Sequence, residues 1–106
     1  MAADRLAQFR LTPAARNDLE DIWRYSASTW SIEQADHYID GLEESFNRLL
    51  LTPEMTRERT EFVPPVRIYR NAQHLIVYRI EADYLAILRV LGGRQDWQAI
   101  LRAIDG

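Results

Sequence analysis

The sequence predicts an α+β domain with an N-terminal strand, a helical hairpin packed on one face of a small antiparallel sheet, and a short C-terminal helix. Three observations predict this class. Apolar residues recur at helical spacing through residues 13–51, and extended runs rich in Ile, Val, Leu and Tyr occupy residues 66–91. The 106 residues suffice for one hydrophobic core but not for two. We therefore expect a single domain over residues 1–106.

The first predicted elements are a short strand and a capped helix. Residues 8–11 alternate weakly in polarity and favour a strand. Thr12 and Pro13 then suit the N-cap and the first position of a helix. The residues that follow helical spacing on one side of it are Leu19, Ile22, Trp23, Ser26 and Trp30. We expect three aromatic side chains to pack in the core of the hairpin, namely Trp23, Trp30 and Tyr38.

A second helix should follow almost without a linker. Ser31 and Gln34 occupy the two positions of a capping box, and the apolar stripe beyond them consists of Ala35, Ile39, Leu42, Phe46 and Leu49. Gly41 inside this helix costs about 1 kcal/mol relative to alanine, so we expect a close contact there with the first helix or with the sheet. Thr52-Pro53 ends the helix, and the polar residues 54–65 predict an exposed connector.

The rest of the chain predicts a three-stranded antiparallel meander with strands at 66–70, 74–80 and 84–91. Strict alternation of side chains puts seven residues on one face, which are Leu75, Val77, Arg79, Leu85, Ile87, Arg89 and Leu91. The hairpin can cover only the opposite face, so this second face needs either the last segment of the chain or a partner. Asp96 is placed to cap that segment as a helix through Ile104, with an apolar side made of Trp97, Ile100, Leu101 and Ile104.

The composition excludes several kinds of chemistry. All 13 cationic residues are arginine, and the chain contains neither lysine nor cysteine. This excludes Schiff-base chemistry, a P-loop, a thiolate metal site and a cysteine nucleophile. The sequence has no stretch long and apolar enough to span a membrane, and its first ten residues hold an acid and two arginines where an export signal needs apolar residues. We expect a cytoplasmic protein without a metal site or a cofactor.

The charge is distributed unevenly along the chain. Residues 1–53 hold 5 arginines against 9 acids, whereas residues 57–94 hold 7 arginines against 4 acids. We therefore expect an anionic partner to bind the second half. The excess is small beside the basic stripe of a dedicated nucleic-acid binder, so we expect no specific nucleic-acid binding and no membrane association.

Three stretches of the sequence, in this order, carry a resemblance to a known family. Leu11–Trp23, Leu75–Arg79 and Arg89–Asp96 resemble the ParE branch of the RelE/ParE toxin superfamily. The resemblance implies the toxin of a type II toxin–antitoxin pair, held inactive in a hetero-oligomeric complex by a cognate ParD-like antitoxin. It also implies DNA gyrase as the target, whereas toxins of the RelE branch cleave mRNA on the ribosome.

The residues favour the gyrase inhibitor over the nuclease. Cleavage in the RelE branch uses several basic residues, commonly lysines, and an aromatic hydroxyl in the last segment. This chain has no lysine and no tyrosine after Tyr84. A remnant of the nuclease constellation would be Arg70 and Arg94, which we name as catalytic only under that alternative. A further alternative is a non-toxic module that binds an antitoxin.

The predicted partner-binding residues lie on the second sheet face and beside it. They are Arg70, Leu75, Val77, Arg79, Leu85, Ile87, Arg89, Arg94 and Trp97. Alternatives remain for some of them. Arg79 could pair with Glu81, and the Arg94–Asp96 segment is either a partner-contacting turn or the cap of the last helix with Arg94 paired to a nearby acid. We expect His74 to be solvated and to have no catalytic role.

Overall fold

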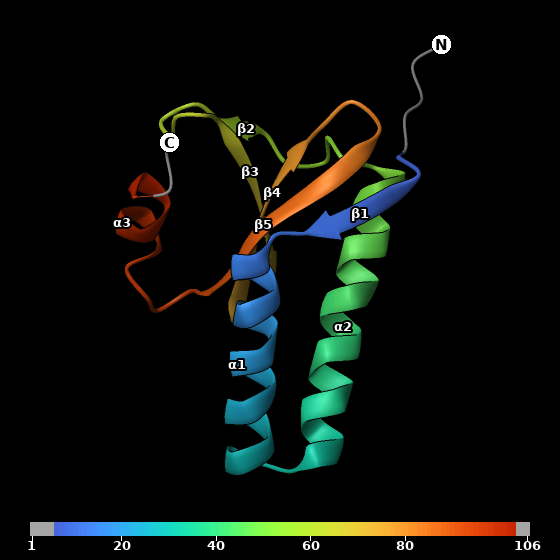
Figure 1. Cartoon of the computed structure of the whole chain (residues 1–106), viewed down its shortest axis with the longest axis vertical. Helices are drawn as coiled ribbons and strands as arrows, with labels where there is room; N and C mark the ends of the chain where they lie inside the picture. The colour runs from blue at the N-terminus through green and yellow to red at the C-terminus, as the bar shows by residue number, and fades with distance from the viewer. Residues whose placement is uncertain (1–5, 104–106) are drawn as a thin grey trace.

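A computed structural model describes residues 6–103 and contains the predicted elements in the predicted order (Figure 1). They are β1 (Gln8–Leu11), α1 (Pro13–Thr29), α2 (Ile32–Leu51), β2 (Glu58–Arg59), β3 (Val66–Asn71), β4 (His74–Ile80), β5 (Tyr84–Gly92) and α3 (Trp97–Arg102). The α+β class is confirmed. The connector differs from the prediction, because it contributes the short strand β2 and buries Phe62. The predicted helical position Ile104 lies outside the described residues.

The strands form one five-stranded sheet in the order β1-β5-β4-β3-β2. The antiparallel meander of β3, β4 and β5 is confirmed. β1, however, pairs in parallel with β5, so the sheet is mixed rather than purely antiparallel. Parallel neighbours need a long crossover, and the chain from β1 to β5 provides one that includes the whole helical hairpin. β1 therefore lies at the edge of the sheet beside the last strand.

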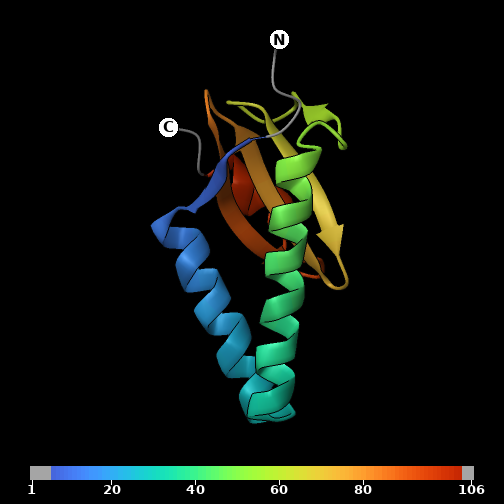
Figure 2. The same cartoon turned by 90° about the vertical axis from the view of Figure 1, so that its right-hand side faces the viewer.

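Two hydroxyl caps position the hairpin as the sequence predicts. The Thr12 hydroxyl accepts a hydrogen bond from the Ala15 amide at 3.0 Å and donates to the Leu88 carbonyl at 2.7 Å, which ties the start of α1 to β5. The Ser31 hydroxyl accepts from the Gln34 amide at 3.0 Å at the start of α2. The α1–α2 link therefore has a defined geometry, and the two helices run antiparallel (Figures 1 and 2).

Each face of the sheet carries its own core cluster. The hairpin covers one face, where the buried residues are Ala15, Leu42, Phe46, Leu49, Ile76, Tyr78, Leu85, Ile87 and Val90. The second face carries a smaller cluster of Phe62, Val66, Val77, Leu91 and Leu101. Figure 2 shows α2 in front of the strands and α3 behind them. The last described helix of the chain thus covers the face that the hairpin leaves open.

Two sequence-based predictions about the hairpin are wrong. Trp30 is 69% exposed rather than buried, because it is the C-cap of α1 at the end of the hairpin furthest from the sheet. Gly41 makes no close contact, since a Cβ atom added there would meet nothing within 4 Å. Packing therefore gives no reason for a glycine at this position of α2.

Candidate partner-binding site

The predicted second face is present on β4 but only partly on β5. Val77 is buried under Phe62 and Leu101, and Leu75 is also buried. Leu85 and Ile87 are instead fully buried against the hairpin, so their predicted position on the second face is wrong. These two side chains are not accessible to a partner in this fold.

A register shift explains the error. Tyr78 faces Ile87 across β4 and β5, but the preceding residue Val77 faces Arg89, so Leu88 is an extra residue in β5. Such a bulge exchanges the two faces for the residues on one side of it. Strict alternation therefore cannot hold for the whole of β5. Val90 and Leu91 after the bulge lie on the predicted faces, whereas Leu85 and Ile87 before it do not.

The Arg89 guanidinium contacts α1 at the edge of the sheet and is not left free on the second sheet face. Its Nε and Nη2 donate to the two carboxylate oxygens of Asp18 at 2.8 and 2.9 Å, and the Val90 amide donates to the same carboxylate at 2.9 Å. This arrangement is possible because β1 ends opposite Ile87, which leaves the edge of β5 open beyond that point. At this open edge the Asp18 carboxylate takes the place of a neighbouring strand as the acceptor for the Val90 amide. The bidentate bond raises the pKa of Arg89 against the opposing effect of burial.

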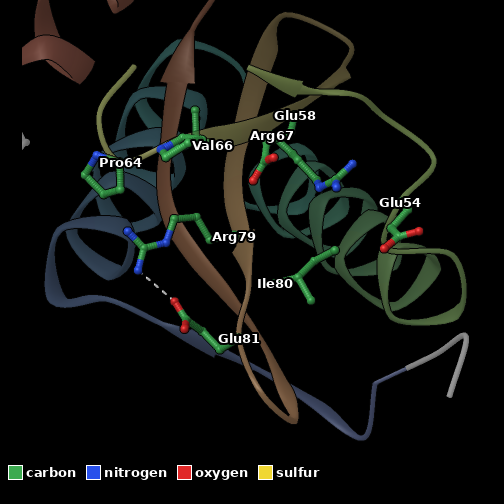
Figure 3. A pocket seen from close by; sticks show the side chains of 9 residues that line it. Glu54, Glu58, Pro64, Val66, Arg67, Arg79, Ile80 and Glu81 are labelled. Carbon is green, nitrogen blue, oxygen red and sulfur yellow. Dashed lines mark hydrogen bonds and ion pairs between the residues drawn. The ribbon is translucent and has the colours of Figure 1, made fainter. Parts of the chain in front are cut away.

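Arg79 does lie on the second face, where it forms the ion pair with Glu81 that the sequence left as an alternative. Arg79 Nη2 and Glu81 Oε2 are 2.8 Å apart, and both side chains are about one third exposed, at 34% and 31%. The pair lies at an open pocket of about 370 Å³ lined by residues of the connector, β3 and β4 (Figure 3). Glu54, Glu58 and Arg67 also line this pocket. Arg79 is therefore within reach of an incoming partner, with Glu81 as the competing carboxylate.

The fold brings Arg70 beside the loop that contains Arg94. A Cβ atom added to Gly93 would lie 3.3 Å from Arg70 Nη2, and the Gly93 amide donates to the Gln73 carbonyl at 2.8 Å. Arg94 itself is exposed and forms no ion pair within residues 6–103. The predicted pairing of Arg94 with an acid is therefore not found there.

Residues Gln95 and Asp96 have structural contacts next to this loop. The Gly92 amide donates to Gln95 Oε1 at 2.6 Å, and the Ala99 amide donates to Asp96 Oδ1 at 3.4 Å. Asp96 thus caps α3, which agrees with one of the two alternatives. All three residues of the segment are exposed, but Arg94 is the one whose side chain makes no hydrogen bond or ion pair within residues 6–103.

Trp97 anchors α3 over the second face and stays partly exposed. Its ring packs beside Phe62 with ring centroids 6.2 Å apart, and the Arg59 guanidinium lies 5.8 Å from the Trp97 ring centroid. Phe62 comes from the connector that the sequence predicts to be exposed, and as the one aromatic residue of positions 54–65 it is the available sequence signal for a buried anchor. Trp97 is therefore both a packing residue and a candidate contact for a partner.

His74 is half-buried rather than solvated. Its Nδ1 and the Tyr38 hydroxyl from α2 are 2.6 Å apart. Burial lowers the pKa of His74 below its ordinary value of 6.5, although the nearby Asp18 charge partly opposes this shift. Burial also raises the pKa of Tyr38, so the tyrosine keeps its proton and can donate it to the neutral imidazole. This contact fixes His74 on the hairpin side of the sheet.

Comparison with known proteins shows the family to which the chain belongs. The sequence pattern of the family described as ParE toxin of the type II toxin–antitoxin system parDE matches residues 9–97. The chain belongs to the ParE toxin family. Toxin ParE1 of Mycobacterium tuberculosis (strain H37Rv) is 30% identical to it over 91 residues, which are 85% of this chain and 93% of the relative. Toxin ParE1 of Caulobacter vibrioides is 31% identical over 83 residues, which are 78% of this chain and 85% of the relative.

A solved structure agrees with the ParE fold. The chain matches a structure of the chromosomal ParDE TA system from P. aeruginosa with a TM-score of 0.71 at 20% identity, over 84% of this chain and 97% of that one. At this level of identity the match supports the fold alone. Within residues 6–103 of this ParE toxin, no helix is long and apolar enough to cross a membrane, and no group of three His, Cys, Asp or Glu side chains could hold a metal ion.

Proposed function

We propose that this ParE toxin inhibits DNA gyrase through protein–protein contact and is neutralised by a cognate ParD-like antitoxin. Its membership in the ParE toxin family of type II toxin–antitoxin systems supports the toxin role. The similar solved structure from P. aeruginosa is that of a ParDE system, which supports a ParD-like partner. The sequence resemblance to the ParE branch supports gyrase as the target.

One observation carries the choice of inhibition over RNA cleavage. Arg70 and His74 are close in sequence but lie on opposite faces of the sheet. Tyr69 and Asn71, the neighbours of Arg70, contact Arg48 and Ser45 of α2 on the hairpin side, and His74 is held there by Tyr38. Strand alternation then directs Arg70 to the second face. His74, the histidine of the sheet, is thus separated from the arginine that would hold a phosphate, and arginine alone does not exchange protons at neutral pH.

The second face offers an antitoxin both charge and apolar surface. Arg70, Arg79, Arg94 and Trp97 remain exposed or partly exposed on this face or beside it, whereas Leu75 and Val77 are buried. An acidic antitoxin segment could compete with Glu81 for Arg79 at the pocket of Figure 3. We therefore expect the antitoxin to supply a carboxylate-rich segment that is disordered before it binds.

Expression in bacteria tests the toxin role. We expect growth arrest with filamentous cells when the chain is induced alone, and normal growth when the antitoxin encoded beside it is induced as well. Normal growth of the chain alone, at a verified level of folded protein, would contradict the toxin role and favour the non-toxic module that binds an antitoxin.

The RNA endonuclease remains a second candidate because the fold brings Arg70 next to the Gly93–Arg94 loop. It predicts cleaved mRNA in a translation reaction that contains ribosomes, and loss of cleavage in Arg70→Ala and Arg94→Ala. We expect intact mRNA. Reproducible cleavage by the wild-type chain that both substitutions abolish would replace gyrase inhibition as the activity.

A further inference from the structure

The free end of the helical hairpin exposes three large apolar side chains. Tyr25 and Trp30 are each 69% exposed and Ile32 is 61% exposed. All three belong to the last turns of α1, the link and the first turn of α2, and we call them the hairpin tip. Burying a side chain of this size is worth about 1.5–3 kcal/mol relative to leaving it in water. Three of the six exposed large apolar side chains of the described residues thus lie within residues 25–32, and such a concentration is more typical of an interaction surface than singly scattered apolar residues are.

The hairpin tip projects beyond the sheet. The molecule measures 45 × 29 × 21 Å, and both views place the tip at one end of the long axis, below the sheet (Figures 1 and 2). In α2, the buried residues beyond Ala35 are Leu42, Ser45, Phe46 and Leu49, all in the half near the sheet. The outer half of the hairpin packs mainly against itself, so its end is open to another protein.

The hairpin tip is held in a defined shape. Trp23 Nε1 donates to Asp36 Oδ1 at 2.8 Å, which links α1 to α2 close to the tip. The Trp30 amide donates to the Ser26 carbonyl at 2.8 Å, and the Ala35 amide donates to the Ser31 carbonyl at 3.0 Å. A surface that is already ordered loses less entropy on binding. Exposed aromatic residues on such a surface are typical anchors of protein interfaces.

The charge around the hairpin tip selects the kind of partner. Residues 20–36 hold four acids, Glu20, Asp21, Glu33 and Asp36, against the one arginine Arg24, a net charge of −3. Arg24 already forms ion pairs with two of these acids, with Nη2 at 3.8 Å from Glu20 Oε1 and Nη1 at 3.2 Å from Asp21 Oδ1. A second copy in a symmetric contact would bring these acids against their own copies, and an anionic membrane surface would repel them. A partner with a basic rim around an apolar pocket fits this surface.

We propose that the hairpin tip is the surface through which the toxin docks on its target protein, and that the target presents an apolar pocket ringed by lysine or arginine. This inference rests on the proposed toxin function and adds the contact surface to it. The predicted antitoxin residues lie on the sheet and α3, away from the tip. Substitutions at the tip should therefore separate target binding from antitoxin binding.

The test compares two double variants of exposed apolar residues. The tip variant combines Tyr25→Ser and Trp30→Ser, and the matched control combines Leu51→Ser and Met55→Ser, whose parent residues are 55% and 43% exposed. Growth arrest, inhibition of purified DNA gyrase, antitoxin affinity and thermal unfolding are measured for both. We expect the tip variant to lose growth arrest and to need on the order of 30-fold more protein for half-inhibition of gyrase, as for the loss of interface anchors. Its fold and antitoxin affinity should match those of the control.

A charge variant tests the basic rim. Glu33→Arg should weaken gyrase inhibition several-fold at low salt, and the effect should shrink as the salt concentration rises. Glu44→Arg, about three turns further along α2, should leave inhibition unchanged at every salt concentration. Equal effects of the two substitutions would contradict the basic rim.

The outcomes distinguish this inference from the proposed function. A folded tip variant that arrests growth as the wild type does would overturn the inference alone. A parallel loss of antitoxin affinity would make the antitoxin the occupant of the tip, and a wild-type dimer that the tip variant abolishes would make it a second copy, so each overturns the inference. If the wild type arrests growth without inhibiting gyrase, gyrase is refuted as the target in the proposed function. The role of the tip is then decided by whether the tip variant still arrests growth. A wild-type chain without toxicity would overturn both.

Discussion

The contact between Asp18 and Arg89 gives the sharpest prediction about stability. Asp18→Asn keeps the shape of the side chain but leaves one acceptor oxygen where the carboxylate accepts from Arg89 Nε, Arg89 Nη2 and the Val90 amide. The amide NH2 would then face a guanidinium donor. Both parent side chains are largely shielded, with 13% of Asp18 and 23% of Arg89 exposed. We expect the free energy of unfolding to fall by about 2–3 kcal/mol, which corresponds to a decrease in Tm of roughly 10 °C or more.

A control on the same helix makes this prediction decisive. Asp21 pairs with Arg24 at 3.2 Å, but these side chains are 75% and 69% exposed, so Asp21→Asn should cost less than about 0.5 kcal/mol. Urea unfolding followed by circular dichroism measures both variants, with and without Arg89→Met as the second substitution. The reasoning is refuted if Asp18→Asn costs no more than Asp21→Asn, or if Asp18→Asn costs as much in the Arg89→Met background.

Three further predictions concern stability and antitoxin binding. Gly41→Ala should raise the free energy of unfolding by about 1 kcal/mol, because the added Cβ meets nothing within 4 Å; a lower Tm than wild type would contradict this. Burial holds the pKa of His74 below 6.5 in the folded state. As the pH falls through 6.5, the unfolded chain therefore binds a proton before the folded chain does, and the free energy of unfolding decreases. His74→Gln should flatten the loss of stability between about pH 7 and pH 5, whereas a flattening by His37→Gln, on the exposed side of α2, would argue against His74 as the source. Arg79→Gln should weaken the antitoxin complex and make its affinity less sensitive to salt, while Arg57→Gln in the exposed connector should not; identical salt dependence in the two variants would exclude the charge contribution of Arg79.

Local signals in the sequence predict most of the fold. Thr12, Ser31 and Asp96 are short polar side chains that precede apolar stripes, and each caps a helix in the structure. The period of the apolar residues separates the helices from the strands, and the short turns predict the antiparallel meander. Each of these signals involves residues that are close together in the chain, so it can be recognised in a single sequence. The parallel pairing of β1 with β5 joins residues about 76 positions apart, and no local pattern carries it.

The candidate site is predicted less completely because it depends on register and on long-range contacts. One extra residue at Leu88 moves Leu85 and Ile87 to the hairpin side. Arg89 and Asp18 are 71 positions apart, so their pairing leaves no spacing that could be recognised. Arg79 and Glu81 are two positions apart, and their pairing is accordingly within reach of sequence reasoning as an alternative. The exposure of Trp30 follows from the length of the hairpin relative to the sheet, which composition and periodicity do not reveal.

The absence of lysine is the compositional feature that favours the proposed inhibition over cleavage. Proton transfer needs a group whose pKa can approach neutral pH, and arginine does not provide one. In the structure, Asp18 holds Arg89, Glu81 holds Arg79, and Arg70 lies against the backbone of its own turn, with Nε donating to the Ala72 carbonyl at 3.2 Å. These contacts are typical of arginine side chains that bind carboxylates and backbone carbonyls with a fixed positive charge.

The supercoiling activity of purified DNA gyrase, titrated with this toxin in the absence and presence of its antitoxin, tests the proposed function most directly. We predict that the toxin alone blocks supercoiling in a concentration-dependent way, and that a stoichiometric amount of antitoxin restores it. Supercoiling that continues at the uninhibited rate with a folded toxin that the antitoxin binds, and without gyrase-dependent DNA breaks, would contradict gyrase inhibition.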